Sequence, residues 1–269
     1  MSNNLFEHIV DVYTAGNKEM RTNAIREAVQ VVALAGLNRG GFFENAAFYG
    51  GTCQRIFYNL DRFSEDLDFS LLKPEENFSL GKYFNSIKDE YSLVGIPVSV
   101  SEKKKSTGTT IHTSFIKIEH EASKLRVKIE VDSSPPPYFQ TEYKLSMLPY
   151  SFMTKCYTPS SSFAAKMDAL LFRGWRNRIK GRDWYDFEWY VRGGIALDLM
   201  HLNERSRQFG HTFSNFTANS LRESLREKIM SVDIGSARKD VLPFISDPNR
   251  LSIWSHEYFI QVADLMKID

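Results

Sequence analysis

The sequence has few cysteines, almost no net charge and no long apolar run, and each absence excludes a class of protein. Cys53 and Cys156 are the only cysteines in 269 residues, so the chain has no disulfide framework and no C-x-x-C metal pair. A net charge of +1 excludes a chain that is basic throughout, so any contact with nucleic acid must be local. Without a basic leader or an apolar run that could cross a bilayer, we expect a cytoplasmic protein with no membrane partner.

Several catalytic signatures are missing as well. The six histidines have no zinc-binding spacing, and the sequence contains neither a Walker loop nor a nucleophile elbow. These absences leave the chemistry to the carboxylates, lysines and glycines.

Hydrophobic periodicity predicts a mixed front part followed by helices. In the front part we expect helices at 18–37, 52–60 and 78–91, and strands at 67–72, 97–102, 109–120 and 125–131. After residue 158 we expect no strand and five helices, at 160–172, 183–191, 196–208, 215–230 and 255–266. The sequence thus predicts an α/β (α+β) fold with two domains. An α/β domain at 1–157 has a mixed, mostly antiparallel sheet of about five strands with flanking helices, and a helical C-terminal domain follows at 158–269.

The stretch FYGGTCQRIFYNLDRFSEDLDF places two aspartates on a predicted strand. Asp66 and Asp68 are two residues apart, so their side chains lie on the same face of that strand. Two adjacent carboxylates repel each other unless they share a cation, and Mg²⁺ suits one or two carboxylates together with substrate phosphates. The spacing therefore predicts a magnesium site.

A glycine turn precedes this pair. Gly50, Gly51 and Thr52 open a predicted helix, where glycines allow close approach of a phosphate and free N–H groups bind it. A third carboxylate is expected on a neighbouring strand, where KLRVKIEVDSS offers Glu130 and Asp132 on one face. Of these two, Glu130 is the preferred candidate. Three acids beside a glycine turn can hold two magnesium ions for chemistry on a nucleoside triphosphate.

The back half contains further candidates. Lys166 lies among small and apolar residues, where a lysine requires an anion unless its charged end reaches solvent. Asp183 and Asp186 begin a predicted helix and can serve catalysis, or only a helix cap and the helix dipole. Arg62 is expected to position the Asp66 carboxylate in a structural ion pair, with a phosphate contact as the alternative. Trp175 and Trp184 alternate with basic residues that predict an RNA-binding patch, namely Arg173, Arg176, Arg178, Lys180 and Arg182.

Two segments together carry a family resemblance. FYGGTCQRIFYNLDRFSEDLDFSL and FAAKMDALLFRGWRNRIKGRDWYDFEWYV resemble the signatures of the AbiEii/AbiGii family, nucleotidyltransferase-like toxins of bacterial toxin–antitoxin and phage-defence (abortive infection) loci. This family belongs to the DNA polymerase β-like nucleotidyltransferase superfamily, and the resemblance spans roughly residues 45–192.

The resemblance implies a role for each matching residue. It gives Gly51 and Thr52 a nucleotide-phosphate role, Asp66 and Asp68 a metal role and Lys166 a nucleotide contact, and it makes Asp183 or Asp186 the acid of the last motif. Cys53 departs from the family by replacing a small or branched aliphatic residue, which is a change of packing.

The implied activity is magnesium-dependent transfer of NMP from an NTP to an acceptor. By resemblance the acceptor is the tRNA 3′ end, and an antitoxin protein is encoded alongside. Three alternatives remain: transfer to a small molecule or protein, a non-catalytic nucleotidyltransferase fold that only binds a partner, and a phosphotransferase that releases ADP.

Overall fold

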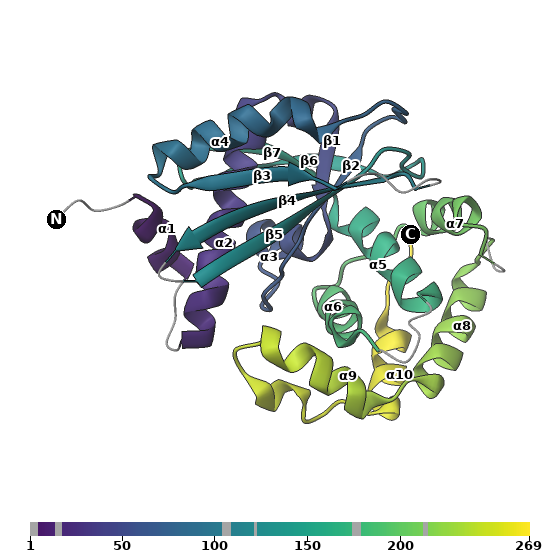
Figure 1. The fold of residues 1–269 in the computed structure, drawn as a ribbon. Coiled ribbons are helices and arrows are strands. Elements are labelled where there is room, and N and C mark those ends of the chain that lie inside the picture. Colours follow the sequence, from purple (N-terminus) through teal and green to yellow (C-terminus); the bar gives the residue numbers. More distant parts are fainter. Residues whose placement is uncertain (1–4, 14–17, 104–108, 121–122, 174–178, 212–214) are drawn as a thin grey trace. The chain divides into compact units, whose positions relative to one another are not determined.

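The protein is described here from a computed structural model that covers residues 5–13, 18–103, 109–120, 123–173, 179–211 and 215–269. The chain divides into two compact units. The first unit contains residues 1–53, 64–135 and 141–156, and the second contains residues 54–63, 136–140 and 157–269. Figure 1 shows the elements of both units along the chain.

The first unit is a sheet with helices. Its strands are β1 (Ala46–Tyr49), β2 (Leu67–Leu71), β3 (Val98–Glu102), β4 (Ile111–His120), β5 (Ser123–Asp132), β6 (Thr141–Ser146) and β7 (Phe152–Tyr157). Its helices are α1 (Leu5–Tyr13), α2 (Lys18–Arg39), the start of α3 (Gly50–Tyr58) and α4 (Phe84–Leu93). All four strands expected from the sequence form, and β4 and β5 pair as the expected antiparallel hairpin, from Ile111 opposite Asp132 to His120 opposite Ser123.

The sheet has seven strands in the order β3-β4-β5-β2-β1-β7-β6, so the expected number of about five was too low. The β3–β4, β4–β5 and β1–β2 pairs are antiparallel, and the β2–β5 and β1–β7 pairs are parallel. The three unexpected strands are β1, β6 and β7. β1 is a four-residue apolar segment, and β6 alternates exposed and half-buried residues at the end of the sheet. Such short strands form because a neighbouring strand completes their hydrogen bonds, which local sequence does not encode.

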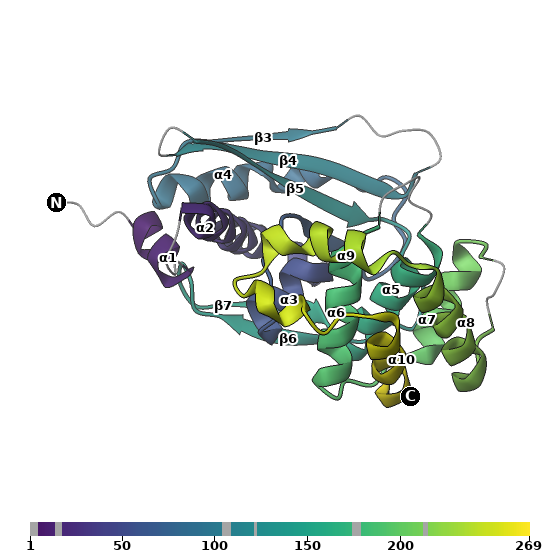
Figure 2. The same cartoon turned by 90° about the horizontal axis from the view of Figure 1, so that it is seen from below.

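The two faces of β3, β4 and β5 have different surroundings. Helices α2 and α4 lie against one face, where Ile116, Val127 and Ile129 are buried (Figure 2). No described helix of the first unit covers the opposite face (Figure 2). Side chains alternate between the faces of a strand, so this second face presents Lys117, Arg126 and their neighbours to solvent.

The second unit is helical. It contains α5 (Pro159–Phe172), α6 (Gly181–Arg192), α7 (Leu199–Gln208), α8 (Ala218–Ser231), α9 (Ile234–Val241) and α10 (His256–Leu265). Thr158, Asp198, Thr217, Asp233 and Ser255 cap the starts of α5, α7, α8, α9 and α10, each accepting a hydrogen bond from a backbone N–H of the first turn. All five expected helices form, and α9 was not expected because it is short and contains a glycine.

Apolar side chains from all six helices form the core of this unit. α6 lies very close to α9: a Cβ atom on Gly181 would lie 1.8 Å from the Ala237 carbonyl oxygen, so a side chain there requires the helices to move apart. Across the described part of both units, none of the helices has the length and apolar character needed to cross a membrane.

Candidate active site

The glycine turn and the aspartate pair meet in the first unit. Gly50 is the first residue of α3 and has φ +79°, in the left-handed region that favours glycine. A Cβ atom on Gly50 would lie 2.5 Å from Asp68 Oδ2 and 3.1 Å from Asp68 Cβ. Asp68 lies opposite Tyr49 of β1, directly before the turn. The glycine therefore lets the carboxylate of Asp68 pack against the start of helix α3.

Thr52 and Asp66 connect the same helix to the start of β2. Thr52 is completely buried, and its Oγ1 donates a hydrogen bond to the backbone carbonyl of Asp66. The Asp66 side chain is 41% exposed and its Oδ2 lies 3.1 Å from Lys128 Nζ. The threonine hydroxyl is thus used in holding the loop before β2, which fixes the position of Asp66.

Glu130 lies beside the aspartate pair, and Asp132 has another partner. The register of the parallel β2–β5 pair places Glu130 opposite Asp68. Glu130 Oε2 accepts a hydrogen bond from Lys128 Nζ at 2.9 Å, so Lys128 bridges Glu130 and Asp66. Asp132 is buried, and its Oδ1 accepts a hydrogen bond from the Ser134 backbone N–H. These contacts favour Glu130 as the third carboxylate.

Lys128 was not predicted from the sequence, although the signal was present. It precedes Glu130 by two residues on the same strand, so the two side chains lie on the same face. Burial lowers the pKa of Lys128, but the hydrogen bond with Glu130 and the charge of Asp66 outweigh burial, and the net shift is upward. The lysine therefore stays protonated between two carboxylates.

The residues present fit a hard cation. The donors are carboxylate oxygens, which Mg²⁺ prefers, and the ammonium group of Lys128 already places a positive charge between Asp66 and Glu130. Among the described residues, no three histidine, cysteine, aspartate or glutamate side chains converge in a ready metal-binding arrangement. Binding a divalent ion therefore requires the carboxylates to turn away from Lys128.

Substituting Gly50 is expected to damage this site. We expect Gly50→Ala to lower the free energy of unfolding by about 1–2 kcal/mol through its left-handed backbone, and also to displace Asp68. Gly210→Ala is the matched control, because Gly210 has φ +67° and nothing lies within 4 Å of its added Cβ. Thermal unfolding should show a similar loss for both variants, whereas only Gly50→Ala should lose Mg²⁺ binding in calorimetry. Equal Mg²⁺ binding by the two variants would contradict the close packing of Gly50 on Asp68.

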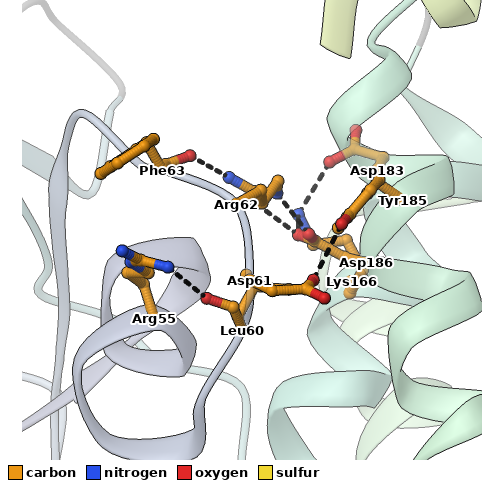
Figure 3. Close-up of polar contacts among 9 residues, drawn as sticks. All are labelled: Arg55, Leu60, Asp61, Arg62, Phe63, Lys166, Asp183, Tyr185 and Asp186. Atoms are coloured by element: carbon orange, nitrogen blue, oxygen red, sulfur yellow. Dashed lines mark hydrogen bonds and ion pairs between the residues drawn. The ribbon is translucent and has the colours of Figure 1, made fainter. Parts of the chain in front are cut away.

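The second unit contains a buried network of charged side chains (Figure 3). Arg62 donates two hydrogen bonds to Asp186, with Nε–Oδ1 at 2.6 Å and Nη2–Oδ2 at 2.7 Å. Lys166 Nζ of α5 lies 2.8 Å from both Asp183 Oδ1 and Asp186 Oδ2 of α6. Arg62 forms an ion pair, as predicted, but its partner is Asp186 and not the expected Asp66. Lys166 is half-buried, with a side chain that is 15% exposed, and its ammonium group contacts both aspartates.

The pKa shifts in this network follow from burial and pairing. Burial raises the pKa of Asp186, but Arg62 and Lys166 outweigh it and lower the pKa to about 2. The pKa of Asp183 is also lowered, because Lys166, Lys180 and Arg173 together outweigh burial. Burial lowers the pKa of Lys166, and the two aspartates overcome it to give a net rise. All these side chains are therefore charged at neutral pH.

Asp183 and Asp186 differ in their surroundings. Asp186 is bound by Arg62 and Lys166 and is 1% exposed. Asp183 faces Lys166 together with Arg173, whose Nη1 lies 3.9 Å from Asp183 Oδ2 and whose side chain is half exposed. Lys180 also acts on Asp183, and burial lowers the pKa of Lys180 to about 8. Cations therefore outnumber carboxylates around Asp183.

The basic run has a different arrangement from the expected RNA patch. The Arg182 guanidinium lies 4.1 Å from the centre of the Phe244 ring, and Lys180 is half-buried. Trp184 was expected to stack on RNA, but it is buried in the core against Phe259, so that expectation was wrong. Trp184 lies on the inner side of α6 because of tertiary packing, which cannot be predicted from the spacing of the charged residues in the sequence. Trp175, Arg176 and Arg178 lie outside the described residues.

Comparisons with known proteins agree with the fold. Two crystal structures share it: a proposed nucleotidyltransferase from H. pylori, at 18% identity over 91% of this chain and 92% of that chain with a TM-score of 0.52, and JHP933 from Helicobacter pylori, at 17% identity over 91% of each chain with a TM-score of 0.53. At these identities the likeness shows the fold alone, which confirms the expected nucleotidyltransferase-like α/β class. No curated protein matches the sequence significantly.

A family profile covers most of the chain. The family described as nucleotidyl transferase AbiEii toxin, type IV toxin–antitoxin system, matches residues 32–262. The match extends beyond the two motifs and includes most of the helical unit. The chain therefore belongs to the AbiEii nucleotidyl transferase toxin family.

Proposed function

We propose that this protein transfers NMP from an NTP to an acceptor hydroxyl with the help of Mg²⁺, and that the acceptor is the 3′ end of tRNA. The observation that carries the proposal is the close packing of Gly50 on Asp68, with Glu130 opposite Asp68 in the sheet. It supports a helix N-terminus that binds phosphates directly beside a set of carboxylates. Family membership supports the toxin role.

Each residue of the first unit has a role in the proposed reaction. The backbone N–H groups of Gly50, Gly51 and Thr52 bind the triphosphate at the start of α3. Asp66, Asp68 and Glu130 would hold two Mg²⁺ ions, which supply Lewis-acid stabilisation of the attacking and leaving oxygens. The acceptor hydroxyl gives its proton to solvent and forms a bond to the α-phosphorus as the bond to the pyrophosphate oxygen breaks. Pyrophosphate then leaves.

The second unit contributes positive charge. Arg62, Lys166, Arg173 and Lys180 carry four cationic groups against two carboxylates, so a nucleotide phosphate would be attracted to this cluster. We propose that Asp183 positions Lys166 for a nucleotide contact, and that Asp186 serves to hold Arg62 and Lys166 in place. An ammonium group has three N–H donors, so Lys166 can donate to a phosphate while it contacts both aspartates.

The partners follow from the same proposal. NTP is the substrate, and the basic residues Arg173, Arg176, Arg178, Lys180 and Arg182 are proposed to contact the tRNA acceptor. A cognate antitoxin protein is the proposed regulatory partner, and the cytoplasm is the proposed location because the substrates are found there.

A transfer assay tests the proposal. The purified protein is incubated with each of the four α-labelled NTPs, Mg²⁺ and total bacterial tRNA, and the RNA is separated on a gel. Labelled RNA together with released pyrophosphate is the expected result. Pyrophosphate release only when small molecules or proteins are added would favour another acceptor, and release of ADP would favour a phosphotransferase. If calorimetry detects no binding of NTP, the remaining explanation is a non-catalytic nucleotidyltransferase fold that only binds a partner.

Removal of Lys128 should strengthen metal binding. The ammonium group competes with Mg²⁺ for Asp66 and Glu130, so we expect Lys128→Met to bind Mg²⁺ roughly 10-fold more tightly, from the loss of one positive charge within a few ångströms. Calorimetric titration with MgCl₂ gives the affinity. The control is Lys88→Met, because Lys88 is an exposed residue of α4, which covers the other face of the sheet. If Lys128→Met binds Mg²⁺ more weakly than the control does, Lys128 does not compete with Mg²⁺ for the carboxylates.

A further inference from the structure

The open face of strands β3, β4 and β5 carries a group of basic and aromatic side chains. We call Phe115, Lys117 and Arg126, with the exposed Ser99 and Ser101 of β3, the basic face. Because side chains alternate along a strand and the buried Ile116 and Val127 face α2 and α4, these residues lie on the opposite side. Lys128 and Glu130 follow Arg126 along the same side of β5, so the basic face continues directly into the carboxylates of the candidate site.

Two features of the basic face indicate an anionic ligand. The register of the β4–β5 hairpin places Lys117 directly opposite Arg126, and like charges in opposing positions destabilise a sheet. Glu119 is the acid next to Lys117 on β4, and its Oε1 lies 3.2 Å from Lys124 Nζ. The charges of Lys117 and Arg126 therefore remain in excess, as complementary binding of a polyanion requires.

Phe115 adds a stacking surface to the basic face. The Arg126 guanidinium carbon lies 3.4 Å from the centre of the Phe115 ring, and Phe115 is half-buried. Flat pairs of arginine and aromatic side chains stack on the bases of single strands. None of the exposed large hydrophobic side chains of the described chain lies on β3, β4 or β5. This face consequently lacks the apolar centre that a protein partner would need.

The length of the face suits a short single strand. Glu130 lies four residues after Arg126 along β5, which corresponds to about 13 Å at the rise of a β-strand. A stacked strand of nucleic acid advances about 3.4 Å per nucleotide. The distance from the carboxylates to Arg126 thus corresponds to about four stacked nucleotides.

We propose that the basic face binds the unpaired 3′ end of the acceptor RNA and directs its terminal hydroxyl toward Asp68 and Glu130. Phe115 and Arg126 stack on a base, and Lys117 contacts the RNA backbone. This inference rests on the proposed function, since it names the surface that holds the acceptor. It adds, to the contact proposed for the basic run of the second unit, an RNA contact on the sheet that carries the carboxylates.

Direct RNA binding is the first test. A fluorescein-labelled single-stranded RNA 10-mer is titrated with wild-type protein, Lys117→Glu/Arg126→Glu and the control Lys88→Glu, and fluorescence anisotropy is measured at several KCl concentrations. We expect the double variant to bind about 100-fold more weakly and to show a salt slope smaller by about one to two. Phe115→Leu should weaken binding about 10-fold with an unchanged salt slope, because it removes stacking and no charge.

The transfer assay separates this inference from the proposed function. The double variant should show a KM for tRNA at least 10-fold above that of the wild type, with an unchanged KM for NTP. The inference would be overturned if the double variant unfolds normally and keeps the wild-type KM for tRNA and the wild-type affinity for RNA. The proposed function would still stand in that case. Failure of the wild type itself to label tRNA would contradict the proposed acceptor, while anisotropy would still decide whether the basic face binds RNA.

Discussion

Asp68→Asn is expected to reduce NMP transfer by roughly 1,000-fold or more while leaving the protein folded. The change removes one negative charge and keeps the size of the side chain, so the packing against Gly50 is retained. Stabilisation of the transferring phosphate depends on the metal that this carboxylate holds, and loss of one preorganised electrostatic contact already costs about 100- to 1,000-fold. Asp66→Asn should have the same effect, and the double variant should be inactive in the transfer assay and non-toxic on expression.

A pair of variants on β5 provides the matched control. Glu130→Gln should lose activity in the same range, because Glu130 lies opposite Asp68 and shares Lys128 with Asp66. Asp132→Asn should keep near wild-type activity, because an amide oxygen can still accept the hydrogen bond from Ser134. The reverse result would make Asp132 the third carboxylate. Full activity of the Asp66→Asn/Asp68→Asn double variant would refute the proposed reaction.

Arg62→Met is expected to lower the free energy of unfolding by about 3–5 kcal/mol at pH 7. Arg62 is 2% exposed and donates twice to Asp186, which would then keep only Lys166, a lysine that it shares with Asp183. The buried charge of Asp186 would lose the partner that binds both of its oxygens, which is why the expected cost is large. Urea unfolding followed by circular dichroism measures the difference.

The control and the pH dependence make this prediction specific. Arg226→Met removes a pair with Asp264 in which both side chains are half exposed, and it should cost less than about 1 kcal/mol. The pKa of Asp186 is lowered to about 2, so its stabilising effect is complete above the unfolded pKa of about 3.9 and is lost as the pH falls toward 2. The difference between wild type and Arg62→Met should therefore narrow below pH 4. A cost no larger than that of Arg226→Met would show that the buried pair contributes little.

Sequence reasoning and structure agree best where a feature is local. The i and i+2 spacing of Asp66 and Asp68 and the glycines at the start of α3 were read from neighbouring residues. Lys128 was not predicted, because the sequence pattern of a metal site consists of acids and does not include the lysine that neutralises them. The stacking role expected of Trp184 was wrong, because a basic, aromatic-rich run looks the same whether its tryptophan faces solvent or the core.

The sequence by itself determined the α/β front part, the helical back part, the family, and the residue types at the candidate site. Strand periodicity, helix spacing and the two motifs are encoded within short windows, which is why they could be predicted. Only the tertiary structure decided that Glu130 lies opposite Asp68, that Arg62 pairs with Asp186 across 124 residues of sequence, and that β1, β6 and β7 complete the sheet. These contacts join residues far apart in the chain, and their energy comes from burial and pairing that exist only after the chain has folded.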